Sequence, residues 1–264
     1  MRERFVSVPA SQFRAEAVQV PGDKSISHRA LFFAALAEGQ SEISGLLESD
    51  DVLSTLRALK SLGVEIEKDG DRWFVQGRGP QAFQAPLTPI DCGNSGTTMR
   101  LLLGILAGQN LGVPVTLTGD ASLKKRPMKR VAEPLVKMGA RIQLSEGGFA
   151  PLQIQGGHLQ ARDYDLPLAS AQLKSALLFA ALSAQGVTRL HGKIASRDHT
   201  ERMLRQFGVE FVCSAEQIAL SGGQKLVPQN VQVPGDPSSA AASVTACMLS
   251  TPFILNAPTA KPCA

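Results

Sequence analysis

The chain has 264 residues, 44% of them hydrophobic and 19% charged, which is enough for one large domain or two smaller ones. It has no run of 18 apolar residues and opens on Met-Arg-Glu-Arg without an apolar leader, so we expect a cytoplasmic protein that is neither secreted nor inserted in a membrane. The four cysteines form no Cys-x-x-Cys pair, which argues against a zinc site and a disulfide framework. The formal charge of +4 could indicate a nucleic-acid partner or small anionic ligands. Proteins that bind single strands use aromatic side chains among their cations, and this chain has only one Trp and one Tyr, so we expect no nucleic-acid partner.

The first part of the chain alternates short strands and helices. Residues 5–20 contain one or two strands, and a Pro-Gly turn then leads into an apolar helix that reaches residue 37 and is stopped by Gly39. A strand follows at 41–46. Asp50 and Asp51 are interpreted as caps of a helix over 52–62, rather than as catalytic acids. Two strands, 64–67 and 73–76, then flank an Asp-Gly turn.

The start of the first helix has the composition of an anion site. Lys24, Ser25 and Arg29 lie where the first backbone N–H groups of the helix have no intrahelical acceptor. The positive end of the helix dipole, an ammonium and a guanidinium all favour a phosphate or carboxylate there. An ordinary capped helix with two solvated cations is the alternative.

The same order of elements recurs twice. Gly93–Thr98 caps a helix over 99–107, followed by a strand at 115–117, a helix from Pro127 to Met138 and a strand from Gly139. The third pass has a helix over 173–183, a strand over 187–190, a helix over 200–207 and a strand over 208–211. Glycines that end the second helix of each pass, Gly63, Gly139 and Gly208, lie about 70 residues apart, which predicts three β-α-β-α-β-β repeats.

Three such repeats around a pseudo-threefold axis would pack their first helices in a shared core, because residues 30–37, 101–107 and 177–182 are apolar nearly all round. The N-termini of these helices would then meet at one end and form a stronger anion site than any one of them. Residues 233–241 echo residues 20–25 and predict the start of a fourth repeat.

Five motifs in this order resemble the 5-enolpyruvylshikimate-3-phosphate (EPSP) synthase family. They are Pro-Gly-Asp-Lys-Ser-Ile-Ser-His-Arg-Ala (21–30), Gly-Asn-Ser-Gly-Thr-Thr-Met-Arg (93–100), Lys-Lys-Arg-Pro-Met (124–128), Ser-Ala-Gln-Leu-Lys-Ser-Ala (170–176) and Ser-Arg-Asp-His-Thr-Glu (196–201). The resemblance implies the enolpyruvyl transferase fold, in which each of two globes is an inside-out α/β barrel of three βαβαββ repeats. Residues 20–231 would be one globe that binds shikimate 3-phosphate, residues 1–19 would lead towards the other, and residues 232–264 would begin it.

The family transfers the carboxyvinyl group of phosphoenolpyruvate to the 5-hydroxyl of shikimate 3-phosphate, on the route to chorismate and the aromatic amino acids. The resemblance implies no metal and no organic cofactor. It assigns Lys24, the catalytic residue, to both substrates, and Arg100 to a supporting role. The implied contacts of shikimate 3-phosphate are Ser25, Arg29, Ser170, Ala171, Gln172, Ser196 and Arg197. The implied contacts of phosphoenolpyruvate are Asn94, Gly96, Thr97, Arg126 and Gln172.

Some features of the family are expected elsewhere. Its carboxylate base pair and further cations belong to the second globe, so we expect a truncated product or a split enzyme. Such a chain would bind shikimate 3-phosphate weakly and turn over little. A second-half chain or self-association would cover the cleft face. The alternatives are a catalytically silent anion-binding or interaction module and UDP-N-acetylglucosamine enolpyruvyl transferase. Glyphosate-tolerant members of the family tend to have a larger residue at the position of Gly96, so the resemblance implies a glyphosate-sensitive pocket here.

Overall fold

The computed structural model describes residues 20–81 and 83–236, so the strands predicted before residue 20 and the fourth repeat predicted beyond residue 236 lie outside the described residues. The chain divides into two units. One comprises Gly22–Pro234. The other comprises Met1–Pro21 and Gly235–Ala264, of which only residues 20, 21, 235 and 236 are described.

Helices of two kinds alternate along the larger unit. The core helices, which are buried almost all round, are α1 (Lys24–Leu36), α3 (Gly96–Ala107) and α5 (Ala171–Ala181). The outer helices, which bury one face each, are α2 (Asp50–Ser61), α4 (Lys129–Met138) and α6 (His199–Gln206). Two short 3-10 turns, η1 (Leu123–Lys125) and η2 (Glu146–Gly148), flank α4 and β6.

The strands form three four-stranded sheets with the same topology. The first has the order β14 (Asn230–Gln232), β1 (Glu38–Ser44), β3 (Arg72–Arg78), β2 (Glu65–Asp69). The second has the order β4 (Ile90–Asp91), β5 (Val115–Thr118), β7 (Phe149–Gln155), β6 (Arg141–Ser145). The third has the order β9 (Asp163–Leu166), β11 (Val187–Gly192), β13 (Ile218–Ser221), β12 (Phe211–Cys213). In each sheet the first pair is parallel and the other two are antiparallel, and a small parallel pair joins β8 (Leu159–Gln160) to β10 (Ala184–Gln185).

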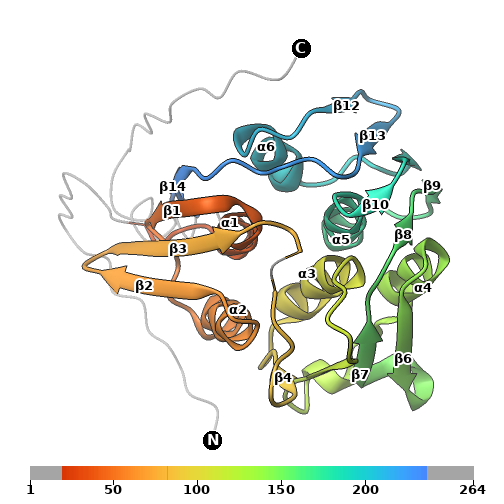
Figure 1. Ribbon diagram of the computed structural model, residues 1–264, viewed down its shortest axis with the longest axis horizontal. Coiled ribbons are helices and arrows are strands. Elements are labelled where there is room, and N and C mark those ends of the chain that lie inside the picture. The colour runs from red at the N-terminus through yellow and green to blue at the C-terminus, as the bar shows by residue number, and fades with distance from the viewer. Residues whose placement is uncertain (1–19, 82, 237–264) are drawn as a thin grey trace, which may run out of the picture. The chain divides into compact units, whose positions relative to one another are not determined.

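The three sheets confirm the repeat predicted from the glycine spacing. Each repeat has a core helix, an outer helix and then two antiparallel strands in the same order, and the three helix-ending glycines all have positive φ angles, from +81° to +117°. The first repeat obtains its outer parallel strand from the end of the third, since β14 pairs with β1. Figure 1 shows α1, α3 and α5 next to one another within the unit, with the sheets around them.

The core helices pack closely because small residues lie where they meet. A Cβ added at Gly104 on α3 would lie 2.2 Å from the carbonyl oxygen of Ala176 on α5. Phe33 and Phe179 bring α1 against α5, with ring centroids 5.0 Å apart. The apolar runs predicted to form a shared core are therefore buried together.

Paired glycines close the second and third repeats against the C-terminal ends of their core helices. A Cβ at Gly156 would lie 2.0 Å from the carbonyl oxygen of Leu106, and the next residue, Gly157, donates its N–H to the carbonyl of Ala107 at 3.0 Å. Gly222 and Gly223 have the same relation to α5. The last strand of each of these two repeats therefore ends in close contact with the backbone at the end of its core helix.

Several predicted boundaries are wrong, each for a local reason. The strand β1 begins at Glu38, whose N–H bonds to the carbonyl of Leu226, so Gly39 lies in the strand and does not stop the helix. The strand predicted at 208–211 begins only at Phe211, because the preceding residues form the turn that ends α6. The outer helix of the second repeat begins at Lys129 rather than Pro127, after a 3-10 turn.

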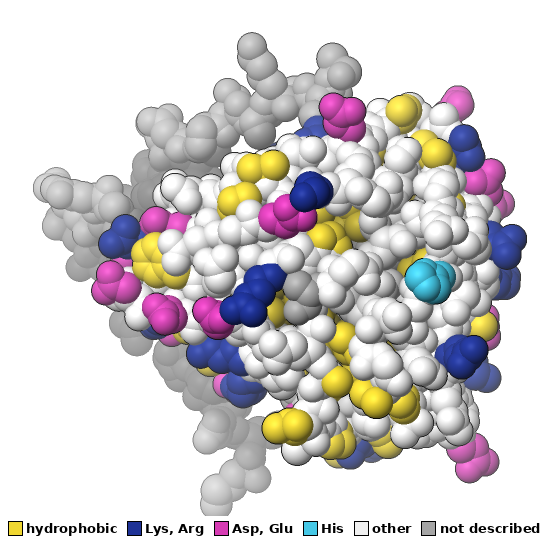
Figure 2. Space-filling view, viewed as in Figure 1, with side chains coloured by type: hydrophobic (Ala, Val, Ile, Leu, Met, Phe, Trp, Pro, Cys, Tyr) yellow, Lys and Arg dark blue, Asp and Glu magenta, His cyan; other side chains and the backbone are white. Residues whose placement is uncertain are grey.

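The charge on the surface is mixed. On the face shown in Figure 2, basic and acidic side chains are interspersed rather than gathered in a continuous basic band, and the apolar patches are small. None of the helices in residues 20–81 and 83–236 combines the length and apolar character needed to cross a bilayer.

Candidate active site

The candidate site lies where the three core helices begin. Each has a side-chain N-cap: Asp23 accepts from the N–H of Ile26 at 2.8 Å, Ser95 from Thr98 at 3.1 Å and Ser170 from Leu173 at 3.3 Å. The remaining N–H groups of the first turns keep the partial positive charge that favours anions. The predicted capping of α3 by its Gly-Asn-Ser-Gly segment is confirmed, although the helix begins at Gly96 rather than Met99.

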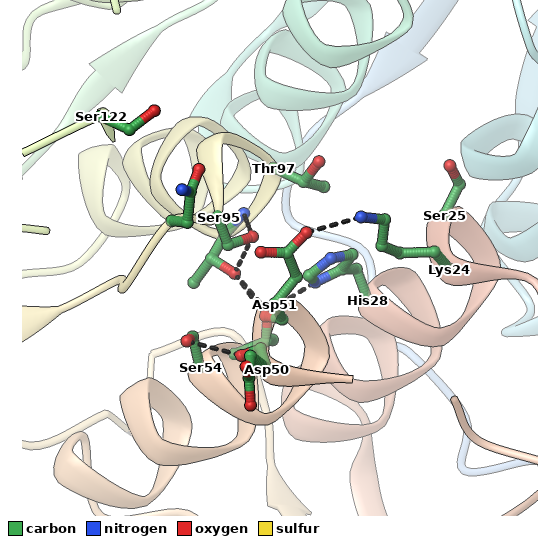
Figure 3. Close-up of polar contacts among 12 residues, drawn as sticks. Lys24, Ser25, His28, Asp50, Asp51, Ser54, Ser95, Thr97 and Ser122 are labelled. Carbon is green, nitrogen blue, oxygen red and sulfur yellow. Dashed lines mark hydrogen bonds and ion pairs between the residues drawn. The ribbon is translucent and has the colours of Figure 1, made fainter. Parts of the chain in front are cut away.

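Lys24 is the first residue of α1 and points toward the start of α2. Its Nζ lies 2.6 Å from Oδ2 of Asp51 (Figure 3). The interpretation of Asp50 and Asp51 as helix caps is wrong, because the N-cap position belongs to Ser49 and both aspartates lie in the first turn. The carboxylate of Asp51 is free to hold Lys24 because it is not bonded to the N–H groups of its own helix.

Gln172 links α5 to α3. Its Oε1 accepts from Nη1 of Arg100 at 2.7 Å, and its Nε2 donates to the hydroxyl of Thr97 at 3.0 Å. These two bonds fix which end of the amide is oxygen. Burial, with Arg130 and Arg126 nearby, lowers the pKa of Arg100 to about 10, which leaves the guanidinium charged at neutral pH.

Arg126 follows η1 and is only partly exposed. Its Nη2 donates to Oδ1 of Asn94 and, at 3.4 Å, to the hydroxyl of Ser122. Gly96 lies against both arginines, since a Cβ there would lie 2.8 Å from Nη1 of Arg100 and 3.2 Å from Nη1 of Arg126. The absence of a side chain at Gly96 is what lets two guanidinium groups approach the start of α3.

Arg197 reaches from the loop between β11 and α6 to the start of α1. Its Nη1 donates to the hydroxyl of Ser25 at 3.1 Å. Ser196 precedes it on the same loop, whereas Ser170 caps α5 and Ala171 is that helix's first residue. The predicted residues from α1 and the third repeat are thereby brought to one surface.

Arg29 is 3% exposed and lies beneath this surface. It donates to the hydroxyl of Thr200, the hydroxyl of Ser175 and the carbonyl of Ser25, at 2.7, 2.7 and 2.9 Å. Burial lowers its pKa to about 10, opposed mainly by Glu201. Arg29 therefore ties α1 to α5 and α6, and two of its five N–H groups remain for other acceptors.

These contacts define an α/β unit whose three helix N-termini present cations and hydroxyl groups at one surface. Lys24, Arg126 and Arg197 are at least partly exposed there, with Arg100 behind them. Such an array suits ligands with phosphate and carboxylate groups.

Comparison with known proteins identifies the family. A family profile described as EPSP synthase (3-phosphoshikimate 1-carboxyvinyltransferase) matches residues 10–255. A 3-phosphoshikimate 1-carboxyvinyltransferase of Bacillus thuringiensis (strain Al Hakam) and one of Bacillus cereus (strain AH187) are each 50% identical over 242 residues, which cover 91% of this chain and 56% of theirs. The solved EPSP synthase of Acinetobacter baumannii superposes with a TM-score of 0.81 at 49% identity, over 85% of this chain and 51% of that one. The chain belongs to the EPSP synthase family and has its enolpyruvyl transferase fold.

The chain spans about half the length of the curated relatives it matches. The family match favours EPSP synthase over the alternative enzyme, UDP-N-acetylglucosamine enolpyruvyl transferase.

The structure adds residues that the sequence reasoning missed. Asp51 was interpreted as a cap, while Lys174, Ser175 and Glu201 lie inside two of the quoted motifs without an assigned role. One signal was available in the sequence: Lys174 lies in a largely apolar helix after Gln172, and a buried lysine needs a partner.

Proposed function

We propose that this chain provides the shikimate 3-phosphate-binding unit of an enzyme that transfers the carboxyvinyl group of phosphoenolpyruvate to the 5-hydroxyl of shikimate 3-phosphate and releases phosphate. The observation that carries the proposal is the convergence of all five motifs on one surface of a chain that belongs to this family. The reaction is inferred from membership of the family. The cations at the starts of α1, α3 and α5 explain why the substrates would carry phosphate and carboxylate groups.

The chemistry requires such an array. The 5-hydroxyl oxygen adds to the phosphate-bearing carbon of phosphoenolpyruvate while the methylene carbon takes a proton, and the tetrahedral adduct then loses phosphate and a proton. Both substrates carry a phosphate and a carboxylate, so fixed cations are needed to bind them and to stabilise the charge that develops on the leaving phosphate.

The proposed roles follow the positions of the side chains. Ser25 and Arg197, with Ser196 and the start of α5, would hold shikimate 3-phosphate, and Arg29 would support them from below. Lys24 would lie between the substrates, held by Asp51 until a ligand competes for its ammonium.

Phosphoenolpyruvate would bind on the α3 side of the surface. Arg126, placed by Asn94, would meet its phosphate, next to Gly96 and Thr97. Gln172, oriented by Arg100, would lie between the two ligands.

Calorimetric titration of shikimate 3-phosphate into the purified chain tests the proposal. We expect saturable binding that Arg197→Ala weakens by about 10- to 100-fold, the range for a lost charge-assisted hydrogen bond. Arg189→Ala is the matched control, because Arg189 is exposed on the strand that leads to the same loop and pairs with Asp163 instead. Equal loss in both variants would contradict a specific site at Arg197.

A phosphate-release assay with phosphoenolpyruvate, run on the same sample, separates two functions. Release that depends on shikimate 3-phosphate and is abolished by Lys24→Met supports carboxyvinyl transfer. Binding without release supports the other candidate, an anion-binding module that acts with a partner. No binding of either substrate would overturn the proposal.

A further inference from the structure

A buried ion pair lies directly beneath the loop that carries Ser196 and Arg197. Lys174 on α5 is 2% exposed and Glu201 on α6 is 4% exposed. Nζ of Lys174 lies 2.5 Å from Oε1 of Glu201. Neither side chain is among the residues assigned above to a substrate.

The ammonium of Lys174 has three N–H groups and three acceptors. Besides Glu201, it donates to the carbonyl oxygen of Ile194 at 3.1 Å and to that of Ser196 at 3.4 Å. Two of its three donors are therefore used on the backbone of the loop rather than on the carboxylate.

Holding these two carbonyls determines where the adjacent N–H groups point. In a trans peptide the C=O of one residue and the N–H of the next point in opposite directions, and the Ala150–Pro151 bond is the cis peptide identified in the described residues. The N–H groups of Ala195 and Arg197 are thus turned away from the ammonium. Within residues 20–81 and 83–236, neither donates a hydrogen bond.

We propose that Lys174 is a positioning residue that makes the loop over residues 194–197 an anion-binding loop, in which the N–H groups of Ala195 and Arg197 contact the phosphate of the ligand. Since the Lys174 ammonium is buried and these N–H groups point away from it, they face the outer side of the loop, where Ala195 and Arg197 are exposed. Successive free N–H groups form anion-binding concavities in other proteins. The inference rests on the proposed function for the identity of the ligand.

Stability alone does not account for this arrangement. A buried ion pair can often be replaced by two apolar side chains of similar size without loss of stability, because desolvation offsets most of the attraction. Oε2 of Glu201 has no hydrogen-bond partner among the described residues, so the carboxylate itself is incompletely satisfied. An apolar pair would reproduce the packing between α5 and α6 but could not bond to the loop carbonyls.

The test is a double variant, Lys174→Met with Glu201→Met, which removes both charges and leaves no buried charge unpaired. Lys225→Met with Glu38→Met is the matched control, because that exposed pair, 3.0 Å apart, lies beyond the C-terminal end of α1. Circular dichroism and a cooperative unfolding transition establish that each variant is folded. Single substitutions are avoided, since either would bury an isolated charge.

Three measurements are made on each folded variant. Calorimetry with shikimate 3-phosphate should show at least a tenfold weaker Kd when Lys174→Met and Glu201→Met are combined, and an unchanged Kd in the control. Titration with shikimate, which lacks the phosphate, should not distinguish the two double variants. Hydrogen exchange of the Ile194 amide, which donates to the carbonyl of Gly192 at 2.8 Å, should be faster in the first variant only when it is measured without ligand.

The outcomes are distinct. A folded double variant with wild-type Kd and wild-type exchange of the Ile194 amide would overturn the inference and leave the pair a packing element. If the wild-type chain binds no shikimate 3-phosphate, the proposed function fails. Unchanged exchange of the Ile194 amide would then overturn the inference as well. Faster exchange, together with less protection of this amide by added inorganic phosphate than in the wild type, would support the inference for phosphate alone.

Discussion

Acidification should destabilise the folded unit through His28. The ring is 1% exposed, its Nδ1 shares a 2.7 Å hydrogen bond with the hydroxyl of Thr55, and its Nε2 has no partner among the described residues. Burial lowers the pKa of His28 from 6.5 to about 3; Arg29 and Lys24 act in the same direction, and Asp51 opposes them. The folded chain therefore keeps His28 neutral at a pH where the unfolded chain protonates it.

The magnitude follows from the two pKa values. Since the unfolded state binds the proton first, stability is fully present above pH 6.5 and is lost as the pH falls toward 3. With about 1.36 kcal/mol for each pKa unit, the loss between pH 7 and pH 5 is about 2 kcal/mol. This is a large share of the net stability of a typical domain.

Urea unfolding followed by circular dichroism at pH 7, 6 and 5 measures this loss. His28→Asn is the informative variant, because an amide can still bond to Thr55 but does not titrate. The free energy of unfolding should fall by about 2 kcal/mol more in the wild type than in His28→Asn over this range. His158→Asn, at an exposed position, should follow the wild-type curve. Parallel curves for wild type and His28→Asn would refute the reasoning.

Two glycine substitutions test other contacts. Gly96→Ala should weaken phosphoenolpyruvate binding roughly tenfold in calorimetry with shikimate 3-phosphate present, because the new Cβ displaces Arg100 and Arg126; an unchanged Kd would place phosphoenolpyruvate elsewhere. Gly104→Ala should lower the free energy of unfolding by about 1–3 kcal/mol, because its Cβ would lie 2.2 Å from the carbonyl oxygen of Ala176. Wild-type stability in denaturant unfolding would show that α3 and α5 can separate without cost.

The repeat was predictable because residues close together in the sequence determine where each helix ends. Glycines such as Gly63 and Gly139 end helices by adopting positive φ angles, which other residues rarely do, so their spacing indicates the repeat directly. The apolar core helices were predictable for a similar reason, since only a helix buried all round lacks a polar face. The pairing of β14 with β1 was not predictable, because short strands carry little information about a partner that is distant in sequence.

The site residues were likewise predictable in part. Lys24, Arg126 and Arg197 could be named from the motifs, but their partners depend on contacts between repeats. Asp51 illustrates the limit: an aspartate at a helix start usually caps it, and only the position of α1 makes this carboxylate a partner of Lys24. The assigned substrate contacts stay predictions until ligand binding is measured.

The pairing of β14 with β1 makes the repeats depend on one another. Val231 is buried opposite Ile43, so the sheet of the first repeat is completed by residues that follow the third. Arg29 likewise joins α1 to Ser175 and Thr200 of the third repeat, beneath the surface where Arg197 meets Ser25. The surface therefore requires the first and third repeats to be folded together, and the first repeat alone would have neither its complete sheet nor the complete set of cations. Loss of the Arg29 contacts should therefore lower both ligand binding and stability, because the same guanidinium holds the first and third repeats together beneath this surface.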